Sequence, residues 1–431
     1  MPSAIDSKAF PLDTLTPHLS PYGRSLLLGE GDVRVPGVTE SCPAFETPPD
    51  PQGWAARVAE ISAGGDHVFL RETSGRVWGW GKNFDEALRK GDSGTGKWVV
   101  PFVIGEDYLY AGAGQGFSAV VRRDGSLWTW GSGYAGRLGD GGGNRGKPER
   151  IGENIVYAEV DNYGGRALAQ DGRLWAWGGD RPHMQVVASD VRQTRGGIPV
   201  LFLRNDGGLW AWRATPEKQH WHGAGFERLP MSRNLELAWR ADGTSWAWGR
   251  TLAAMSTSSP LPGLEQSPWP RLVGEGWVDV KTSDSGTLVA ARKSDDSLWV
   301  SQEHGSSVRM DHLGCGFADM AFAYDESHGV HLLALRTDGT LLDYHGDPDR
   351  GMNVRNSLLV RKPEVLATNG IKLFQEGDYL GNVGAEVFLL RRDGTLWKWY
   401  WRFGMNAAES VPVPALRLEK IELPKEWFKL D

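Results

Sequence analysis

Hydrophobic positions along the chain recur in short runs of about five residues, without the spacing of a helix. Residues 67–71 (HVFLR), 118–122 (SAVVR) and 387–391 (VFLLR) are apolar runs of this kind, and each is followed by an Asp-Gly pair or a variant and a second apolar run. Asp-Gly between two apolar runs predicts a β-hairpin, and we assign it to a type I′ turn, which needs positive φ at both central residues. The pattern therefore predicts many short antiparallel strands.

The second run of each hairpin carries a Leu-Trp-x-Trp-Gly motif or a degenerate copy of it. Eight copies occur at steps of roughly 35 to 55 residues, which is typical of repeated supersecondary units. Two tryptophans separated by one residue point to the same face of a strand. Because both runs are apolar on both faces, we expect them to be sandwiched between neighbouring units. The structural repeat residues are Trp78, Trp80, Trp128, Trp130, Trp175, Trp177, Trp210, Trp212, Trp246, Trp248, Trp397 and Trp399, with Gly125, Gly172, Gly207, Gly243, Gly339 and Gly394 in the turns.

The repeats predict an all-β fold, a single β-propeller of seven to eight blades, each a four-stranded antiparallel sheet. We expect residues 54–431 to form the propeller. Residues 1–53 hold no copy and several prolines, which predicts an extended arm or a partial blade. The two termini are expected to meet and close the ring. Longer segments are expected to be loops on one face or the rim, at residues 213–234, 250–276, 346–362 and 401–414.

Composition and net charge bear on the kind of fold and on the class of partner. The 57 glycines and 21 tryptophans suit short strands joined by tight turns, and the net charge of −7 argues against binding to a nucleic-acid backbone.

Cys42 and Cys315 are the only cysteines. A disulfide between them stays open, but a reducing compartment is the simpler interpretation. The N-terminus shows no secretory signal and no apolar stretch is long enough to span a bilayer, so we expect a soluble, cytoplasmic and monomeric protein without membrane contact.

Two segments resemble a P-loop, residues 91–97 (GDSGTGK) and 141–147 (GGGNRGK). The next residue should be Ser or Thr to hold magnesium, but Trp98 and Pro148 stand there. A helix should follow the loop, whereas residues 99–105 (VVPFVIG) look like a strand. We therefore expect two loops between strands and no nucleotide site.

Other candidate chemistry is sparse. His220 with His222, and His328 with His331, lack the third and fourth ligands that a metal site needs. The aspartates of the turns are explained by hairpin geometry, and no nucleophile motif is present. We expect no metal, no cofactor and no enzymatic activity.

Three tryptophans outside the repeat stand in the longer segments, namely Trp221, Trp269 and Trp401. Exposed tryptophan is enriched at binding hot spots, so we name them as candidate partner-binding residues together with His220 and His222. The alternative is that each tryptophan covers the rim of its own blade.

Several repeats carry a second signature. Residues 61–65 read ISAGG and precede Asp66 and His67, residues 110–114 read YAGAG, and a Gly-x-Leu-Gly turn follows Trp130. With these motifs the chain resembles the regulator of chromosome condensation repeat family of β-propellers, over roughly residues 61–401. Stand-alone bacterial members, such as a propeller-type β-lactamase inhibitory protein, are the most similar in organisation. At the family's histidine position, we expect His67 to make a structural hydrogen bond to a turn.

The resemblance implies several uses. Relatives include guanine-nucleotide exchange factors for small GTPases that bind chromatin, adaptor or scaffold proteins, and enzyme inhibitors. We expect a non-catalytic protein that binds a partner protein through one face, with an inhibitor or immunity-type protein as one form. A regulator of a small GTPase is an alternative. Chromatin is disfavoured because the first 60 residues hold only Lys8, Arg24, Arg34 and Arg57 as basic residues. A lectin is a further alternative, disfavoured because the spare tryptophans are irregularly placed.

Overall fold

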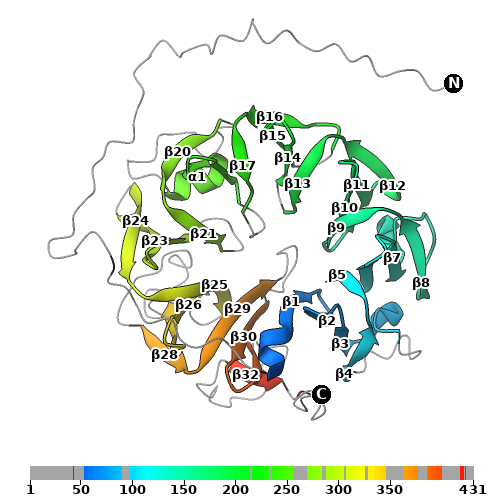
Figure 1. Cartoon of the computed structure of the whole chain (residues 1–431). Coiled ribbons are helices and arrows are strands. Elements are labelled where there is room, and N and C mark those ends of the chain that lie inside the picture. The colour runs from blue at the N-terminus through cyan, green and yellow to red at the C-terminus, as the bar shows by residue number, and fades with distance from the viewer. Residues whose placement is uncertain are drawn as a thin grey trace, which may run out of the picture.

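The structure is a computed structural model that describes most of the repeat region (Figure 1). The described residues are 42, 53–89, 98–197, 199–213, 216–230, 232, 235–255, 269–283, 288–304, 307–325, 329–345, 363–376, 386–399, 418–421 and 423. Of the predicted arm at residues 1–53, only Cys42 and Gly53 are among them. No helix in these ranges is long and apolar enough to cross a membrane.

The chain forms a β-propeller of eight blades, as the repeats predict, and each blade is a sheet of four consecutive antiparallel strands. The first four blades are β1 (Val58–Ala63), β2 (His67–Glu72), β3 (Val77–Lys82) and β4 (Trp98–Gly105); β5 (Tyr108–Ala113), β6 (Phe117–Arg122), β7 (Leu127–Gly131) and β8 (Arg145–Gly152); β9 (Ile155–Val160), β10 (Gly164–Ala169), β11 (Leu174–Gly178) and β12 (Arg181–Ala188); β13 (Val191–Arg195), β14 (Val200–Arg204), β15 (Leu209–Trp212) and β16 (His220–Gly223).

The remaining four blades repeat this order. They are β17 (Phe226–Arg228), β18 (Leu237–Arg240), β19 (Thr244–Ala247) and β20 (Arg271–Glu275); β21 (Trp277–Thr282), β22 (Val289–Lys293), β23 (Leu298–His304) and β24 (Ser307–Gly314); β25 (Phe317–Asp325), β26 (Gly329–Arg336), β27 (Leu341–His345) and β28 (Glu364–Ala367); β29 (Gly370–Glu376), β30 (Glu386–Arg391), β31 (Leu396–Trp399) and β32 (Leu418–Ile421). The helical elements are η1 (Gly53–Arg57), η2 (Phe84–Glu86), η3 (Tyr134–Gly136) and α1 (Gly249–Met255).

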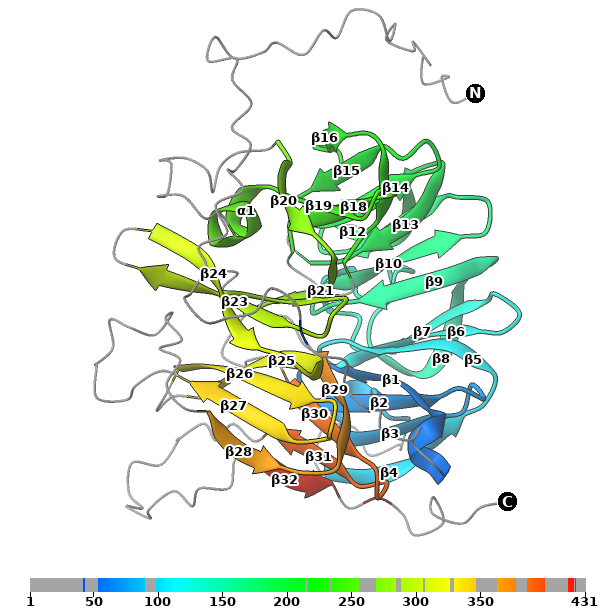
Figure 2. The same cartoon turned by 60° about the vertical axis from the view of Figure 1, so that its left-hand side comes forward.

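The ring closes where the first blade packs against the eighth, with β1 beside β29 (Figures 1 and 2). Trp54, Ile61 and Trp80 share one buried hydrophobic cluster with Phe388 and Leu423. Burying large aromatic side chains between blades is the main favourable contribution to folding here, because a single blade cannot bury both of its faces.

The hairpin turns differ from the predicted type I′ geometry. In the second blade the N–H of Gly125 donates to the carbonyl of Arg122, and the N–H of Arg122 donates to the carbonyl of Ser126. Gly125 has φ +80°, whereas Asp124 has no positive φ. This is a type I turn followed by a left-handed residue, which forms a bulge. The same left-handed position is held by Gly172, Gly207, Gly243, Gly339 and Gly394, and by Asp296 in the sixth blade.

The two tryptophans of each hairpin have different surroundings. The second is buried, at 5% exposure or less, in Trp80, Trp130, Trp177, Trp212, Trp248 and Trp399. The first is only half-buried in most blades, namely at Trp128, Trp175, Trp210, Trp246, Trp299 and Trp397. Its indole lies beside a cation of the same hairpin, as Arg122 lies 4.5 Å from the ring centroid of Trp128 and Arg173 lies 5.3 Å from that of Trp175. The expectation that both members of the pair are buried is therefore wrong for the first.

Two of the segments expected to be loops contain strands instead. Residues 213–234 hold β16 and β17, and residues 250–276 hold most of α1 and all of β20. These three strands stand at the edges of their sheets, are paired on one side only and are partly exposed, so they lack the apolar run by which central strands are recognised. The segments 346–362 and 401–414 lie outside the described residues.

Candidate protein-binding surface

One end of the propeller carries the connections between the first and second and between the third and fourth strands of each blade, because antiparallel strands reverse direction at every turn. In the first three blades these connections present Phe84, Asp85, Tyr134, Arg137 and Tyr163, which we call the turn surface. Tyr134 is 71% exposed, Tyr163 48% and Phe84 36%. Tyrosine and arginine are enriched at protein-binding hot spots.

The turns η2 and η3 occupy equivalent places in the first and second blades and have the same backbone. Their middle residues are left-handed, with φ 50° at Asp85 and 51° at Ala135. The next residue is left-handed too, at Glu86 in one turn and Gly136 in the other. A residue other than glycine in this conformation costs about 1–3 kcal/mol, and such strain clusters at functional sites.

Buried hydrogen bonds hold each turn against the following blade. The indole Nε1 of Trp130 donates to the carbonyl of Ala87 at 2.8 Å, and that of Trp177 donates to the carbonyl of Arg137 at 2.8 Å. Ala87 and Arg137 are equivalent residues, each directly following its turn. The second tryptophan of a hairpin thus fixes the turn of the preceding blade.

His67 belongs to the same network. Its Nε2 lies 2.8 Å from the hydroxyl of Ser118, which in turn donates to the carbonyl of Ala87 at 2.9 Å. Burial lowers the pKa of His67 to about 3, so the ring stays neutral at neutral pH. The histidine reaches the turn through Ser118, one step removed from the direct hydrogen bond expected from the sequence.

Arg137 lies at the centre of the turn surface. Its guanidinium donates to the carbonyl of Gln115 at 3.1 Å and to its side-chain oxygen at 2.8 Å, and it lies 5.2 Å from the ring centroid of Tyr134. Burial lowers the pKa of this guanidinium, and the nearby carboxylates of Asp85 and Asp161 partly oppose that shift. A buried, anchored cation beneath exposed aromatic rings loses little freedom when a partner binds.

Acidic groups surround this cation. Burial raises the pKa of Asp66, and Lys82 and Arg137 partly oppose that shift. Across the gap between blades, the amide Nδ2 of Asn144 donates to Asp85 at 2.8 Å and its oxygen accepts from the N–H of Gly133. The first and second blades therefore present one connected polar surface.

The predicted partner-binding residues that the structure describes lie elsewhere, on β16 of the fourth blade and just before β20 of the fifth. His220 and Trp221 are exposed on β16, Trp221 at 45%. His222 is buried and stacks on Trp248 with ring centroids 4.9 Å apart, at the point where the register between β15 and β16 shifts. The expectation that these three residues lie on a loop is wrong, since they lie on β16, and the expectation that they are exposed is wrong for His222. Trp269 is 58% exposed just before β20, and Trp401 lies outside the described residues.

Turn-surface residues were missed because they stand in short polar turns without a tryptophan. The sequence does contain a signal for these turns. The Gly-x-Leu-Gly turn after Trp130 in the second blade is equivalent to residues 86–89 in the first blade. Exposed aromatic residues immediately before that position, Phe84 and Tyr134, would have identified it.

The structure also places the two P-loop-like segments and the second pair of histidines. Trp98 begins β4, so the predicted strand after the first P-loop-like segment is present, while residues 91–97 are not described. The second such segment, 141–147, leads into β8. His331 is fully buried and its Nδ1 lies 2.9 Å from a carboxylate oxygen of Asp343, and His328 lies outside the described residues.

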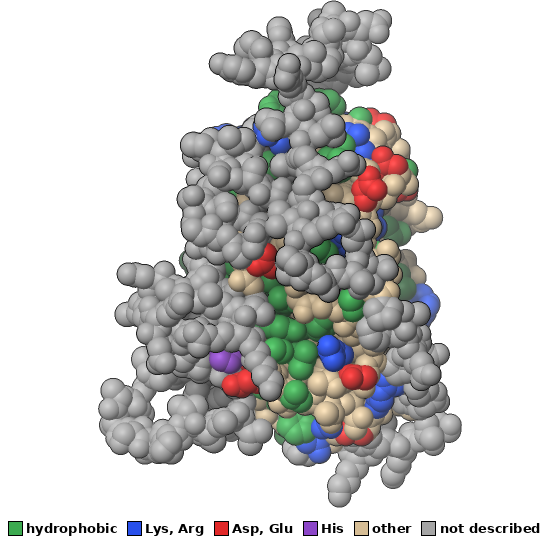
Figure 3. All heavy atoms as spheres, turned by 90° about the vertical axis from the view of Figure 1, so that its left-hand side faces the viewer, with side chains coloured by type: hydrophobic (Ala, Val, Ile, Leu, Met, Phe, Trp, Pro, Cys, Tyr) green, Lys and Arg blue, Asp and Glu red, His purple; other side chains and the backbone are tan. Residues whose placement is uncertain are grey.

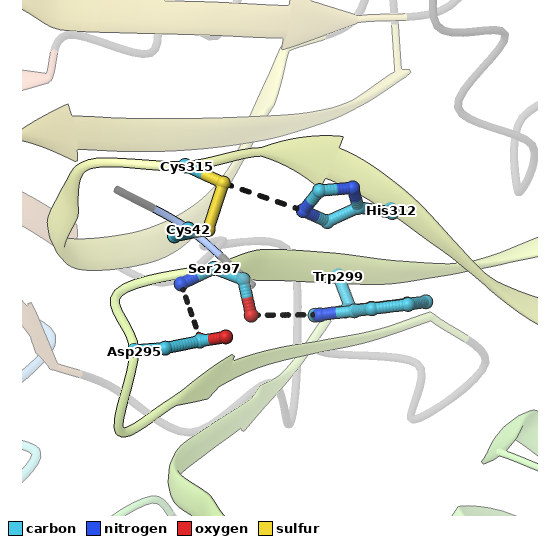
Figure 4. The surroundings of a disulfide bond; sticks show 6 residues. All are labelled: Cys42, Asp295, Ser297, Trp299, His312 and Cys315. Carbon is cyan, nitrogen blue, oxygen red and sulfur yellow. Dashed lines mark hydrogen bonds between the residues drawn. A yellow bond between two sulfur atoms is a disulfide. The ribbon is translucent and has the colours of Figure 1, made fainter. Parts of the chain in front are cut away.

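The two cysteines are bonded to each other. Cys42 and Cys315 form a disulfide with their Cα atoms 5.5 Å apart, near His312 and Trp299 (Figure 4). The simpler interpretation from the sequence, two reduced thiols, does not describe this structure. The signal was ambiguous because 273 residues separate the two cysteines and only the ring geometry brings them together.

Charge is mixed on the side of the ring that carries β24 and β28. In Figure 3 the described Lys and Arg side chains there alternate with Asp and Glu, with hydrophobic side chains between them.

Known proteins resemble the chain in sequence and in fold. The repeat model described as regulator of chromosome condensation (RCC1) repeat matches residues 58–85, from β1 into η2. The human regulator of chromosome condensation is 31% identical over 122 residues, covering 27% of this chain and 28% of the relative. The Caenorhabditis elegans X-linked retinitis pigmentosa GTPase regulator homolog is 33% identical over 129 residues, covering 26% of this chain and 9% of the relative.

Solved structures were found at lower identity. Human WBSCR16 is 15% identical with a TM-score of 0.43, covering 78% of this chain and 87% of that one. Prp20p from Saccharomyces cerevisiae is 13% identical with a TM-score of 0.44, covering 75% and 81%. The two sequence relatives above are matched over less than a third of their own length. The predicted resemblance is confirmed: the chain is an eight-bladed propeller that carries a regulator of chromosome condensation repeat in its first blade.

Proposed function

We propose that the chain is a non-catalytic protein-binding propeller whose turn surface contacts the partner. The observation that carries this proposal is the placement of exposed Tyr134 and Tyr163 beside the anchored cation Arg137, with exposed Phe84 in the equivalent turn of the first blade. Hot spots combine aromatic anchors with arginine, and a rigid support reduces the entropy lost on binding. A cytoplasmic location remains a prediction that accompanies this proposal.

A small GTPase is the second candidate partner. One relative carries the name GTPase regulator homolog, and its similarity reaches over a quarter of this chain. The repeat that matches the family model ends within η2, so the resemblance includes part of the turn surface. An inhibitor or immunity-type role is another form of protein binding, and it differs from GTPase regulation in the identity of the partner and in the effect on the partner's activity.

The test begins with affinity purification of the tagged full chain and identification of stoichiometric partners. The partner is then purified and its affinity is measured for wild type, for the Phe84→Ala/Tyr134→Ala double variant, and for Trp221→Ala as a control on the outer rim. Loss of two aromatic anchors should weaken binding at least about 30-fold, since hot-spot truncations cost about 2 kcal/mol or more. Trp221→Ala should bind as wild type does.

Two results would redirect the proposal. Equal binding by the double variant, with Trp221→Ala impaired, would move the interface to the outer rim. If the partner is a small GTPase, release of a fluorescent guanine nucleotide in the presence of the chain separates a regulator from a simple binder. Accelerated release that the double variant loses would establish the second candidate at the turn surface.

A further inference from the structure

Three metal-ligating side chains meet between the sixth and seventh blades. Cys315 stands in the connection from β24 to β25, His312 lies on β24, and Cys42 reaches the same place from the N-terminal part of the chain (Figure 4). The Nε2 of His312 is 3.9 Å from the sulfur of Cys315. One ligand atom from each residue lies within 4.8 Å of both others.

The histidine is held in place by the blade itself. His312 is the register partner of Trp299 on β23, and their ring centroids are 4.8 Å apart. Trp299 is fixed in turn, because its Nε1 donates to the hydroxyl of Ser297 at 3.0 Å. The imidazole that faces Cys315 therefore packs on a ring whose own position is fixed.

These distances suit a tetrahedral metal centre. With Zn–S near 2.3 Å and Zn–N near 2.0 Å, two sulfurs around zinc lie about 3.8 Å apart, and a sulfur and a nitrogen about 3.5 Å apart. The distance between His312 and Cys315 is already close to that value. Only the two sulfurs must separate, and breaking their bond is what makes them thiolate ligands.

We propose that the reduced chain binds one zinc ion through the thiolates of Cys42 and Cys315 and the imidazole of His312. A dithiol reductant supplies two electrons and two protons to the disulfide, giving two thiols while the reductant becomes a disulfide. Zinc then displaces the two thiol protons into solvent as the two Zn–S bonds form. Three protein ligands leave a fourth position for water or for a ligand from a partner.

The disulfide and the zinc site exclude each other, so the redox state of the compartment selects between them. In an oxidising compartment the disulfide joins the N-terminal part of the chain to the ring, and in a reducing one zinc makes the same connection. Soft thiolates together with imidazole favour zinc over magnesium or calcium. This inference does not depend on the proposed function of the turn surface.

A second cluster supplies an internal control. Asp343, His345 and Glu364 in the seventh blade also bring their ligand atoms within 4.8 Å of one another. Their two carboxylates and one imidazole contain no sulfur, so cobalt bound there would lack sulfur-to-metal charge-transfer absorption. The spectrum of a cobalt-loaded chain thus reports which cluster holds the metal.

The experiment titrates cobalt(II), a spectroscopic substitute for zinc, into the full chain after reduction with a phosphine and removal of metals by a chelator. We expect one cobalt per chain with near-ultraviolet thiolate-to-cobalt absorption, displaced by zinc, and no such absorption from the oxidised chain. His312→Gln should weaken binding at least about tenfold while both thiols remain. Cys42→Ser, whose position lies outside any strand or helix, should remove most of the absorption without affecting the ring.

His345→Ala is the matched control and should bind cobalt as the wild type does. The proposal is overturned if the reduced wild type gives no thiolate absorption, or the same spectrum as a Cys42→Ser/Cys315→Ser variant. It is also overturned if His345→Ala abolishes binding while His312→Gln has no effect, because the metal would then lie in the seventh blade. Circular dichroism of each variant verifies that the propeller is intact.

Discussion

The indole Nε1 of Trp130 in the second blade donates a 2.8 Å hydrogen bond to the carbonyl of Ala87, directly after the turn η2 of the first blade. This bond joins a tryptophan of the repeat to the turn that displays Phe84. It makes the repeat motif responsible both for packing between blades and for the position of the candidate binding surface.

Replacing Trp130 by Phe keeps an aromatic ring but removes this donor. The Ala87 carbonyl still accepts from Ser118, so we expect a loss of about 1–2 kcal/mol in the free energy of unfolding, measured by denaturant titration. Trp128→Phe is the control, since that indole is half-buried and donates to the hydroxyl of Ser126. A larger loss for Trp128→Phe than for Trp130→Phe would contradict the assigned roles.

Two turn glycines allow the cost of a left-handed backbone to be compared with the cost of a steric clash at an added Cβ. Gly339 and Gly243 have φ +89° and +82°, but a Cβ at residue 339 would lie 2.9 Å from the carbonyl oxygen of Gly370, whereas a Cβ at residue 243 meets nothing within 4 Å. Gly243→Ala should cost about 1–2 kcal/mol of stability from the left-handed backbone alone. Gly339→Ala should cost more, and equal losses in thermal unfolding would show that the neighbouring blade yields to the methyl group.

A fully buried pair inside the seventh blade should be sensitive to removal of one member. Both carboxylate oxygens of Asp343 lie within 3.1 Å of Nδ1 of His331. Asp343→Ala should destabilise the chain by about 1–3 kcal/mol, because it removes a hydrogen-bond partner from a buried polar group. Asp343→Asn keeps an acceptor for the imidazole and should cost clearly less. Comparable losses for the two variants in denaturant titration would count against this pair as a stabilising contact.

Much of the fold could be predicted from the sequence, because each blade repeats one local signal. Asp-Gly before Leu-Trp-x-Trp marks a hairpin wherever it occurs, and even the degenerate DDSLWV copy forms one, with Asp296 in the left-handed position. Outer strands such as β16 escaped prediction because an edge strand with one exposed face needs no apolar run. Part of the turn surface escaped it because Tyr163 of the third blade approaches Arg137 of the second only when the two blades pack, and no local pattern encodes that proximity.

His67 gives the fold a pH dependence whose sign can be worked out. Its pKa is about 3 in the folded chain against an ordinary value of 6.5, so it is neutral in both states above pH 6.5. Between pH 6.5 and 3 the unfolded chain binds a proton that the folded chain does not. The free energy of unfolding should therefore fall as the pH falls through this window, by up to about 1.4 kcal/mol per pH unit from this residue.

His67→Gln removes the titrating group and retains an amide that can reach the hydroxyl of Ser118. We expect the variant to be less stable than wild type at pH 7, since a buried hydrogen bond is altered, but to lose less stability between pH 6.5 and 4.5. Turn aspartates such as Asp124, whose pKa is lowered by hydrogen bonds from Ser126, titrate below this range. Buried Glu60, whose pKa is raised by burial, contributes equally to both proteins and cancels in the difference. Parallel curves for the two proteins, from denaturant titrations at each pH, would show that His67 does not set the acid sensitivity of the propeller.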